Sequence, residues 1–274
     1  MRAATIARPE RRSGARVYAR VVAGGVETAC VGRGQLADLM AGDCLAARAD
    51  ERPARLVFAV NGHAIALSAM DGEFRHLFAQ ADIVHADGQP VVAASKWLSE
   101  TAIPERSATT DFLFDAAAAA EAAGLSFYLL GSTAAVNAAC AADLASKHPS
   151  LKIAGRRDGY FTRAEEAAVV DAINESGADV LWVGLGVPKE YEFCVRNRQR
   201  LKVGWVVTCG GCFNFAAGDY ARAPEWMRTA GLEWLYRLAR EPKRLFWRYA
   251  VTNPVAAFLL MTRTFSASVV QGGA

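Results

Sequence analysis

The chain has 274 residues, of which 53% are hydrophobic and 22% charged, and its formal net charge is +3. This length is enough for one full α/β domain with a short appendage, and the apolar fraction supplies a sizeable core. The small net charge excludes a strongly basic chain, so we expect no nucleic-acid partner. Because no apolar run reaches the roughly 18 residues that cross a bilayer, we expect a cytoplasmic or peripheral protein.

The first segment, residues 1–27, is rich in arginine and has no sustained apolar period, so we expect a mobile arm there. It also lacks the apolar stretch of a secretory signal. We therefore expect the six cysteines to be reduced thiols in a cytoplasmic setting. The role of the arm is open, and a second contact with anionic lipid is one alternative.

The next segment, residues 28–220, alternates short apolar runs with stretches of helical periodicity. Strands separated by helices of this length predict an α/β fold, with a Rossmann-like parallel sheet flanked by helices. Ligands in such sheets bind beyond the carboxyl ends of the strands. The predicted strands cover residues 55–61, 126–131, 152–155, 179–184 and 204–209, and the predicted helices cover 112–123, 134–147 and 163–175.

The last segment, residues 221–274, differs in composition. Between residues 222 and 263 it holds eight basic residues, three acidic residues and three of the six tryptophans. If this segment is helical, Trp234, Leu235, Leu238 and Leu245 share one face. A basic helix with Trp and Leu on one face is typical of a peripheral membrane contact with anionic lipid. The alternative is a C-terminal helix that packs on the core and has a solvated basic rim.

Two predicted strand ends carry polar side chains suited to catalysis. An apolar run ends in Asp87 and Gly88, and the strand over residues 55–61 ends in Asn61. A carboxylate at such a position can serve as a general base for a substrate at the edge of the sheet. Most Asp-Gly pairs, however, are only turn signals.

Two further strand ends are rich in glycine. Gly131 precedes a Ser-Thr pair and a predicted helix, which suits a phosphate or only a helix N-cap. The stretch from Gly184 through Gly186 and Pro188 to Lys189 follows another strand and offers a lysine for a pyrophosphate. Neither stretch contains a complete dinucleotide fingerprint or P-loop pattern.

The sequence contains no pattern typical of a metal site. Cys209 and Cys212 have C-x-x-C spacing, but no second pair of ligands is nearby, so we expect a Gly-Gly turn between two buried thiols. The histidines are isolated, and no Asp-x-Asp occurs. We therefore expect no metal and no cofactor, with arginine or lysine neutralising any phosphate charge.

The chain resembles the WecG/TagA/CpsF family of glycosyltransferases over residues 28–263. The order and spacing of several motifs together carry this resemblance. The motifs are residues 81–88, 127–131, 155–161, 173–179, 183–189, 210–213, 222–227, 231–237 and 241–244.

The resemblance implies a metal-independent, inverting hexosyl- or N-acetylhexosaminyl-transferase. It implies transfer from a UDP-sugar donor to a polyprenyl-diphosphate-linked acceptor in bacterial exopolysaccharide or cell-surface glycan synthesis, at the cytoplasmic face of the inner membrane. In this scheme Asp87 is the general base, Arg106 stabilises the donor diphosphate and Asn61 contacts substrate. The other residues expected to bind substrate are Gly88, Gly131, Gly184, Gly186, Pro188, Lys189, Glu190, Gly210, Gly211, Asn214, Arg222 and Arg237.

Four positions depart from the family pattern. Glu190 replaces a glutamine, Asn214 an aspartate, Thr109 a glycine and Ala59 a threonine. Glu190 is open to two roles: pairing with a sugar amine or hydroxyl, or sharing the base role. The departures also leave open a non-catalytic nucleotide-sugar-binding protein of polysaccharide assembly. A Rossmann oxidoreductase is a weaker alternative, because the glycine fingerprint is incomplete. The donor sugar, the acceptor, the linkage and a homo-oligomeric state stay open.

Overall fold

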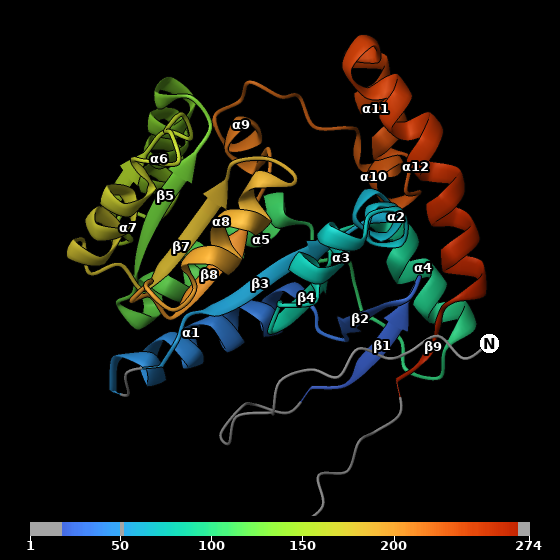
Figure 1. Cartoon of the computed structure of the whole chain (residues 1–274), viewed down its shortest axis with the longest axis horizontal. Coiled ribbons are helices and arrows are strands. Elements are labelled where there is room, and N and C mark those ends of the chain that lie inside the picture. The colour runs from blue at the N-terminus through green and yellow to red at the C-terminus, as the bar shows by residue number, and fades with distance from the viewer. Residues whose placement is uncertain (1–17, 50–51, 268–274) are drawn as a thin grey trace, which may run out of the picture.

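The structure, a computed structural model, describes residues 18–49 and 52–267. Its main sheet has six parallel strands in the order β4-β3-β8-β7-β5-β6, with helices on both faces (Figure 1). The strands are β3 Arg55–Val60, β4 Ile83–Ala86, β5 Ser126–Gly131, β6 Lys152–Arg157, β7 Val180–Gly184 and β8 Trp205–Thr208. The α/β, Rossmann-like prediction is confirmed.

Two hydrophobic clusters cover the two faces of this sheet. One contains Phe112 and Trp182, whose rings lie 5.6 Å apart, and it joins the sheet to α1 Arg33–Ala49, α5 Thr109–Ala123, α6 Ala134–Lys147 and α9 Cys212–Ala216. The other lies under α2 Gly62–Met70, α3 Gly72–Phe78, α4 Gln89–Leu98, α7 Glu166–Glu175 and α8 Lys189–Asn197. Central strands buried on both faces explain the continuous apolar runs in the sequence.

Asp179 secures the amino-terminal edge of the sheet. Its carboxylate accepts hydrogen bonds from Arg48 of α1 at 2.7 and 2.8 Å and from the Ser126 N–H at 2.7 Å. A buried carboxylate needs such partners, because burying it unpaired is costly. This edge lies opposite the carboxyl ends of the strands, so Asp179 is structural.

A second, three-stranded sheet joins the two ends of the chain. β1 Arg20–Ala23 pairs antiparallel with β2 Val26–Ala29 and with β9 Phe265–Ser266. The turn between β1 and β2 uses Gly24 and Gly25, both with positive φ, which is the geometry of a tight hairpin. Residues 20–27 therefore belong to a hairpin and not to a mobile arm, which corrects this part of the prediction. Residues 1–17 of the predicted arm lie outside the described residues.

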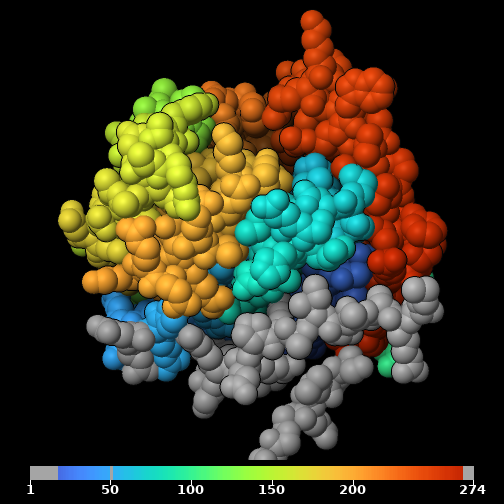
Figure 2. All heavy atoms as spheres, in the orientation of Figure 1, coloured from blue at the N-terminus to red at the C-terminus, as the bar shows by residue number. Residues whose placement is uncertain are grey.

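The C-terminal segment forms three helices, α10 Glu225–Thr229, α11 Glu233–Arg240 and α12 Pro242–Thr262. The expectation of one helix face shared by Trp234, Leu235, Leu238 and Leu245 is wrong. Helix α11 ends at Arg240 and a new helix begins at Pro242. Proline lacks the N–H that a continuing helix needs and is favoured in the first turn of a new one. The three helices, called here the C-terminal appendage, lie along one side of the molecule (Figure 2).

Candidate active site

The pairing of β3 with β4 brings Asn61 and Asp87 together at the carboxyl edge of the sheet. Val60 is the register partner of Ala86, so the next residue of each strand lies beside the other. The Asn61 side chain donates through Nδ2 to Asp87 Oδ2 at 3.1 Å. Its own Oδ1 accepts from the Ala64 N–H at 3.2 Å and caps α2. Asn61 therefore both begins a helix and orients the carboxylate.

Thr109, at the start of α5, holds the other oxygen of Asp87. Its N–H donates to Asp87 Oδ1 at 2.9 Å, and its hydroxyl lies 3.4 Å from the same atom. A carboxylate offers about four acceptor positions, so these contacts leave at least one for a substrate hydroxyl. Asp87 is half-buried and thus within reach of a ligand. Its orientation and remaining acceptor capacity suit a general base.

Gly88 lies close to Asn61. A Cβ at Gly88 would lie 3.2 Å from the Asn61 Cα, so a larger residue would require a shift of a few tenths of an ångström. The Asp-Gly pair joins β4 to the start of α4, where Gly88 is the N-cap residue.

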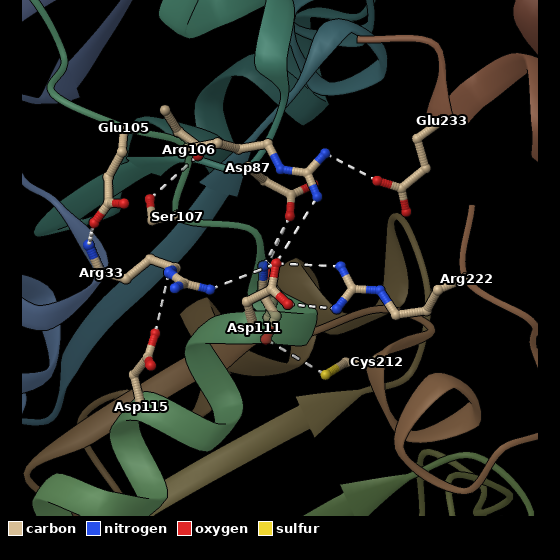
Figure 3. Close-up of polar contacts among 12 residues, drawn as sticks. Arg33, Asp87, Glu105, Arg106, Ser107, Asp111, Asp115, Cys212, Arg222 and Glu233 are labelled. Atoms are coloured by element: carbon tan, nitrogen blue, oxygen red, sulfur yellow. Dashed lines mark hydrogen bonds and ion pairs between the residues drawn. The ribbon is translucent and has the colours of Figure 1, made fainter. Parts of the chain in front are cut away.

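Arg106 lies next to this carboxylate and contacts the C-terminal appendage. Its side chain is only 13% exposed and pairs with Glu233 of α11, with Nη1 and Oε2 2.9 Å apart (Figure 3). A second guanidinium nitrogen lies 3.9 Å from Asp111. The Arg106–Glu233 ion pair connects the loop between α4 and α5 to a helix 127 residues later in the chain.

Arg222 reaches the same region from the segment that precedes α10. Its guanidinium contacts both oxygens of Asp111, one of them at 3.1 Å, as a bidentate pair (Figure 3). Burial would raise the pKa of Asp111, but the hydrogen bond and charge of Arg222, with Arg33 and Arg106, lower it instead. Asp111 thus stays anionic and gathers three arginines beside Asp87.

The loops after β5, β7 and β8 approach each other so closely that they require glycine. Gly131 has a φ of 141°, and a Cβ there would lie 2.3 Å from the Gly184 oxygen. A Cβ at Gly184 would in turn lie 2.9 Å from the Gly210 oxygen. These glycines therefore form one continuous backbone surface at the edge of the sheet, adjoining Gly186 and Gly211.

Glu190 lies beneath this surface and joins two of the loops. It is 2% exposed, and its Oε2 accepts from the N–H of Gly186 at 3.0 Å and of Gly210 at 3.1 Å. Burial raises the pKa of Glu190 to about 7, opposed by hydrogen bonds from Gly186, Gly210 and Leu185. Its carboxylate thus faces backbone N–H groups, in a position unlike that of half-buried Asp87.

Three further candidates lie away from the Asp87 cluster. Asn214 of α9 accepts from the Ser132 hydroxyl at 3.3 Å and donates to Asp219 at 3.4 Å. Pro188 and Lys189 are exposed at the start of α8.

Arg237 of α11 lines a groove of about 380 Å³ between α9 and the appendage. Its guanidinium lies 5.5 Å from the centre of the Phe215 ring, in a cation–π contact. The groove also contains Tyr220, Tyr236 and Arg240. Aromatic rings and arginines together suit a ligand with a planar ring and a negative charge.

Pro188 lines a second groove, of about 370 Å³, between α2, α3 and α12. His63 and Arg248 provide nitrogen atoms there, and Leu67 and Val251 are among its apolar residues. Burial, with the charge of Arg248, lowers the pKa of His63 to about 4. His63 is therefore neutral at neutral pH, and Arg248 is the cation of this groove.

The cysteine prediction is confirmed. Cys209 and Cys212 are buried on either side of a Gly-Gly turn, and all six cysteines are free. Burial raises the pKa of both thiols well above the ordinary value, so they are poor nucleophiles.

Within residues 18–49 and 52–267, no cluster of three or more His, Cys, Asp or Glu side chains has the arrangement of a metal site. In the same part of the chain, no helix is long and apolar enough to span a membrane.

The sequence analysis predicts site roles for Asn61, Asp87, Arg106 and Arg222 but does not predict the partners that hold these side chains in the structure. Thr109 was noted only as a departure from a glycine, and Glu233 only as part of a motif. Asp111 carried one weak signal, an acidic residue in the first turn of a helix. Such partners become visible only when segments distant in sequence meet.

One comparison with known proteins bears on this arrangement. The sequence model of the glycosyl transferase WecG/TagA/CpsF family matches residues 25–269, which is most of the chain. The match spans the carboxylate after β4, the glycine loops and the appendage. The chain belongs to the WecG/TagA/CpsF family of glycosyltransferases.

Proposed function

We propose that the protein is an inverting glycosyltransferase that moves a sugar from a UDP-sugar to a polyprenyl-diphosphate-linked acceptor in the synthesis of a bacterial exopolysaccharide or cell-surface glycan. Family membership supports a transferase of cell-surface glycan synthesis. The observation that carries the finer proposal is the Asp87 carboxylate, oriented by Asn61 and Thr109 beside the arginine cluster.

The reaction is a single displacement. Asp87 accepts the proton of an acceptor hydroxyl as its oxygen attacks the anomeric carbon, and UDP leaves from the opposite face of the sugar. Negative charge grows on the diphosphate, and arginine stabilises it through charge-assisted hydrogen bonds. Arg106 and Arg222 come from different segments and both contact Asp111, and each already binds a carboxylate that a diphosphate would replace. This step needs no redox cofactor.

UDP release tests the proposal. Purified protein is mixed with a panel of UDP-sugars and polyprenyl-diphosphate-linked sugars in liposomes, and released UDP is measured. Release that requires both substrates is expected. UDP binding without release in any combination would favour the non-catalytic nucleotide-sugar-binding protein, and tight NAD binding would favour the oxidoreductase.

We also propose that the appendage holds the protein on an anionic membrane, at the cytoplasmic face of the inner membrane. Phe246 and Trp247 at the start of α12 are 52% and 73% exposed. Lys243 and Arg244 lie in the preceding turn of α12, and α11 ends with Arg240. Exposed aromatic residues beside a group of cations suit the interface of an anionic bilayer.

Replacing both Phe246 and Trp247 with serine is expected to weaken binding to phosphatidylglycerol vesicles by about tenfold or more, because each buried aromatic side chain contributes about 1.5–3 kcal/mol. Co-sedimentation with the vesicles measures the change. Added salt is expected to weaken vesicle binding by the wild-type protein as well. Trp97→Ser is the matched control, because Trp97 is 79% exposed on α4. Equal binding by the double variant and the wild type would contradict this role of the appendage.

A further inference from the structure

Glu190 is a buried carboxylate without a cation. Within residues 18–49 and 52–267 no basic side chain forms an ion pair with it, and its partners are backbone N–H groups. One of them, from Gly186, belongs to the loop after β7, and another, from Gly210, belongs to the loop after β8. A carboxylate in this position is costly to bury. We therefore look for its role in the two loops whose N–H groups it binds.

Glu190 links the two loops at glycine residues. Gly186 and Gly210 have φ values of 77° and 50°, a region that glycine enters freely. Neither has a side chain with which to pack. One Glu190 oxygen accepts from both, so it links the ends of two neighbouring strands at a single point.

We propose that Glu190 is a positioning residue: its ionised carboxylate fixes the loops after β7 and β8 in the shape that receives the UDP part of the donor. This inference rests on the proposed function. The ionised form is the competent one, because Oε2 accepts from both loops and a charged oxygen accepts more strongly than the oxygen of a neutral acid. Protonation of the carboxyl group therefore weakens both hydrogen bonds and loosens the link.

The environment places this change near neutral pH. Burial raises the pKa of Glu190 to about 7, and only backbone hydrogen bonds oppose it. The titratable neighbours that interact with it are Tyr191 and Cys194 of α8 and Cys209 after β8. Burial raises the pKa of all three well above the ordinary value, so they stay neutral across this range. Lys189 and Glu192, the charged neighbours on α8, are at least partly exposed and do not contribute to the shift.

The first test is the pH dependence of donor binding. In the wild-type protein the Kd for UDP, measured by calorimetry, is expected to rise several-fold as pH falls from 8 to 6, with a midpoint near 7. Glu190→Gln keeps the shape but removes the charge, so its Kd should be high and should keep only the pH dependence of the terminal phosphate of UDP, whose pKa is about 6. Glu190→Asp keeps the charge but is one methylene shorter, so its Kd should be high and still depend on pH. Glu192→Gln, on the same helix, should match the wild type.

The second test is stability, which does not depend on any activity. The folded-state pKa of Glu190 lies above the unfolded value of 4.5, so the folded state binds the proton more tightly. The contribution of Glu190 to the free energy of unfolding is therefore fully present below about pH 4.5 and is lost as pH rises towards 7. The folding equilibrium constant should lose up to about two orders of magnitude over this range, and Glu190→Gln should abolish that part of the slope.

The outcomes separate this inference from the proposed function. Transferase activity together with a UDP Kd whose pH dependence is the same in the wild type and Glu190→Gln would overturn the role of Glu190 alone. A UDP Kd that depends less on pH in Glu190→Gln than in the wild type, without transfer to any acceptor, would support the role of Glu190 while contradicting the transferase.

Discussion

Replacing Asp87 with asparagine is expected to lower kcat by about 10²–10⁴-fold, the usual contribution of a general base. Asparagine keeps the size of the side chain but cannot take up the proton of the acceptor hydroxyl. It also cannot accept from both Thr109 and Asn61, because one of its two terminal atoms is itself a donor. The measurement is the initial rate of UDP release at saturating donor and acceptor.

The control for this prediction is Asp143→Asn, which neutralises an aspartate on α6 that pairs with Lys147. Its kcat should stay within about twofold of the wild type, as is usual for a surface change. The KM for the donor should also change little in Asp87→Asn, because the lost interaction belongs to the transition state. Full activity of Asp87→Asn would contradict the assigned base and turn the search to another acceptor near the anomeric carbon.

Replacing Arg106 with alanine is expected to lower kcat by about 10²–10³-fold, the typical loss when one stabiliser of developing negative charge is removed. Arg106 is nearly buried beside Asp87, so water replaces it poorly. Arg106→Lys should recover only part of the rate, because lysine keeps the charge but not the planar fork of donors. Single-turnover rates with the intact lipid-linked acceptor measure the effect.

Glu233→Gln separates the chemical role of Arg106 from its structural role. This variant removes the ion pair between the core and α11 and leaves the arginine in place. Because a diphosphate would displace Glu233 from Arg106, we expect the rate to change by less than about tenfold. If Glu233→Gln is as inactive as Arg106→Ala, the pair serves to dock the appendage and Arg106 is not the phosphate contact.

The main sheet could be predicted because its strands carry their own signal. The apolar runs around Val57, Leu129, Val183 and Val207 are buried on both faces and read as strands without any tertiary information. The helix at residues 134–147 was also predicted at its observed bounds. Polar residues at the ends of these runs, Asn61 and Asp87, could then be placed at one edge by topology alone.

Contacts between distant segments could not be predicted in the same way. The hairpin around Gly24 and Gly25 has a turn signal, but β9 joins it only because residues some 240 positions apart meet. The ion pair of Arg106 with Glu233 likewise depends on how the appendage packs. Residue propensity and hydrophobic periodicity depend on neighbours along the chain, so they do not predict contacts between distant segments.

The role of Glu190 shows the same limit within the site. The sequence shows that a glutamate stands where the family pattern has a glutamine, but it does not show which groups this glutamate contacts. A glutamate seen only in sequence is expected to face solvent or a ligand, whereas this one faces the N–H groups of Gly186 and Gly210. Only the convergence of two strand ends reveals that arrangement.

The measurement that tests the central claim most directly is the mass of the lipid-linked acceptor, with the anomeric configuration of the new linkage determined by NMR, after incubation with the UDP-sugar that supports release. The wild-type protein is predicted to add one sugar residue to the acceptor, with the anomeric configuration of the donor inverted in the product, and Asp87→Asn is predicted to leave the acceptor mass unchanged over the same time. A product with retained configuration, or equal conversion by Asp87→Asn, would contradict the single displacement with Asp87 as its base.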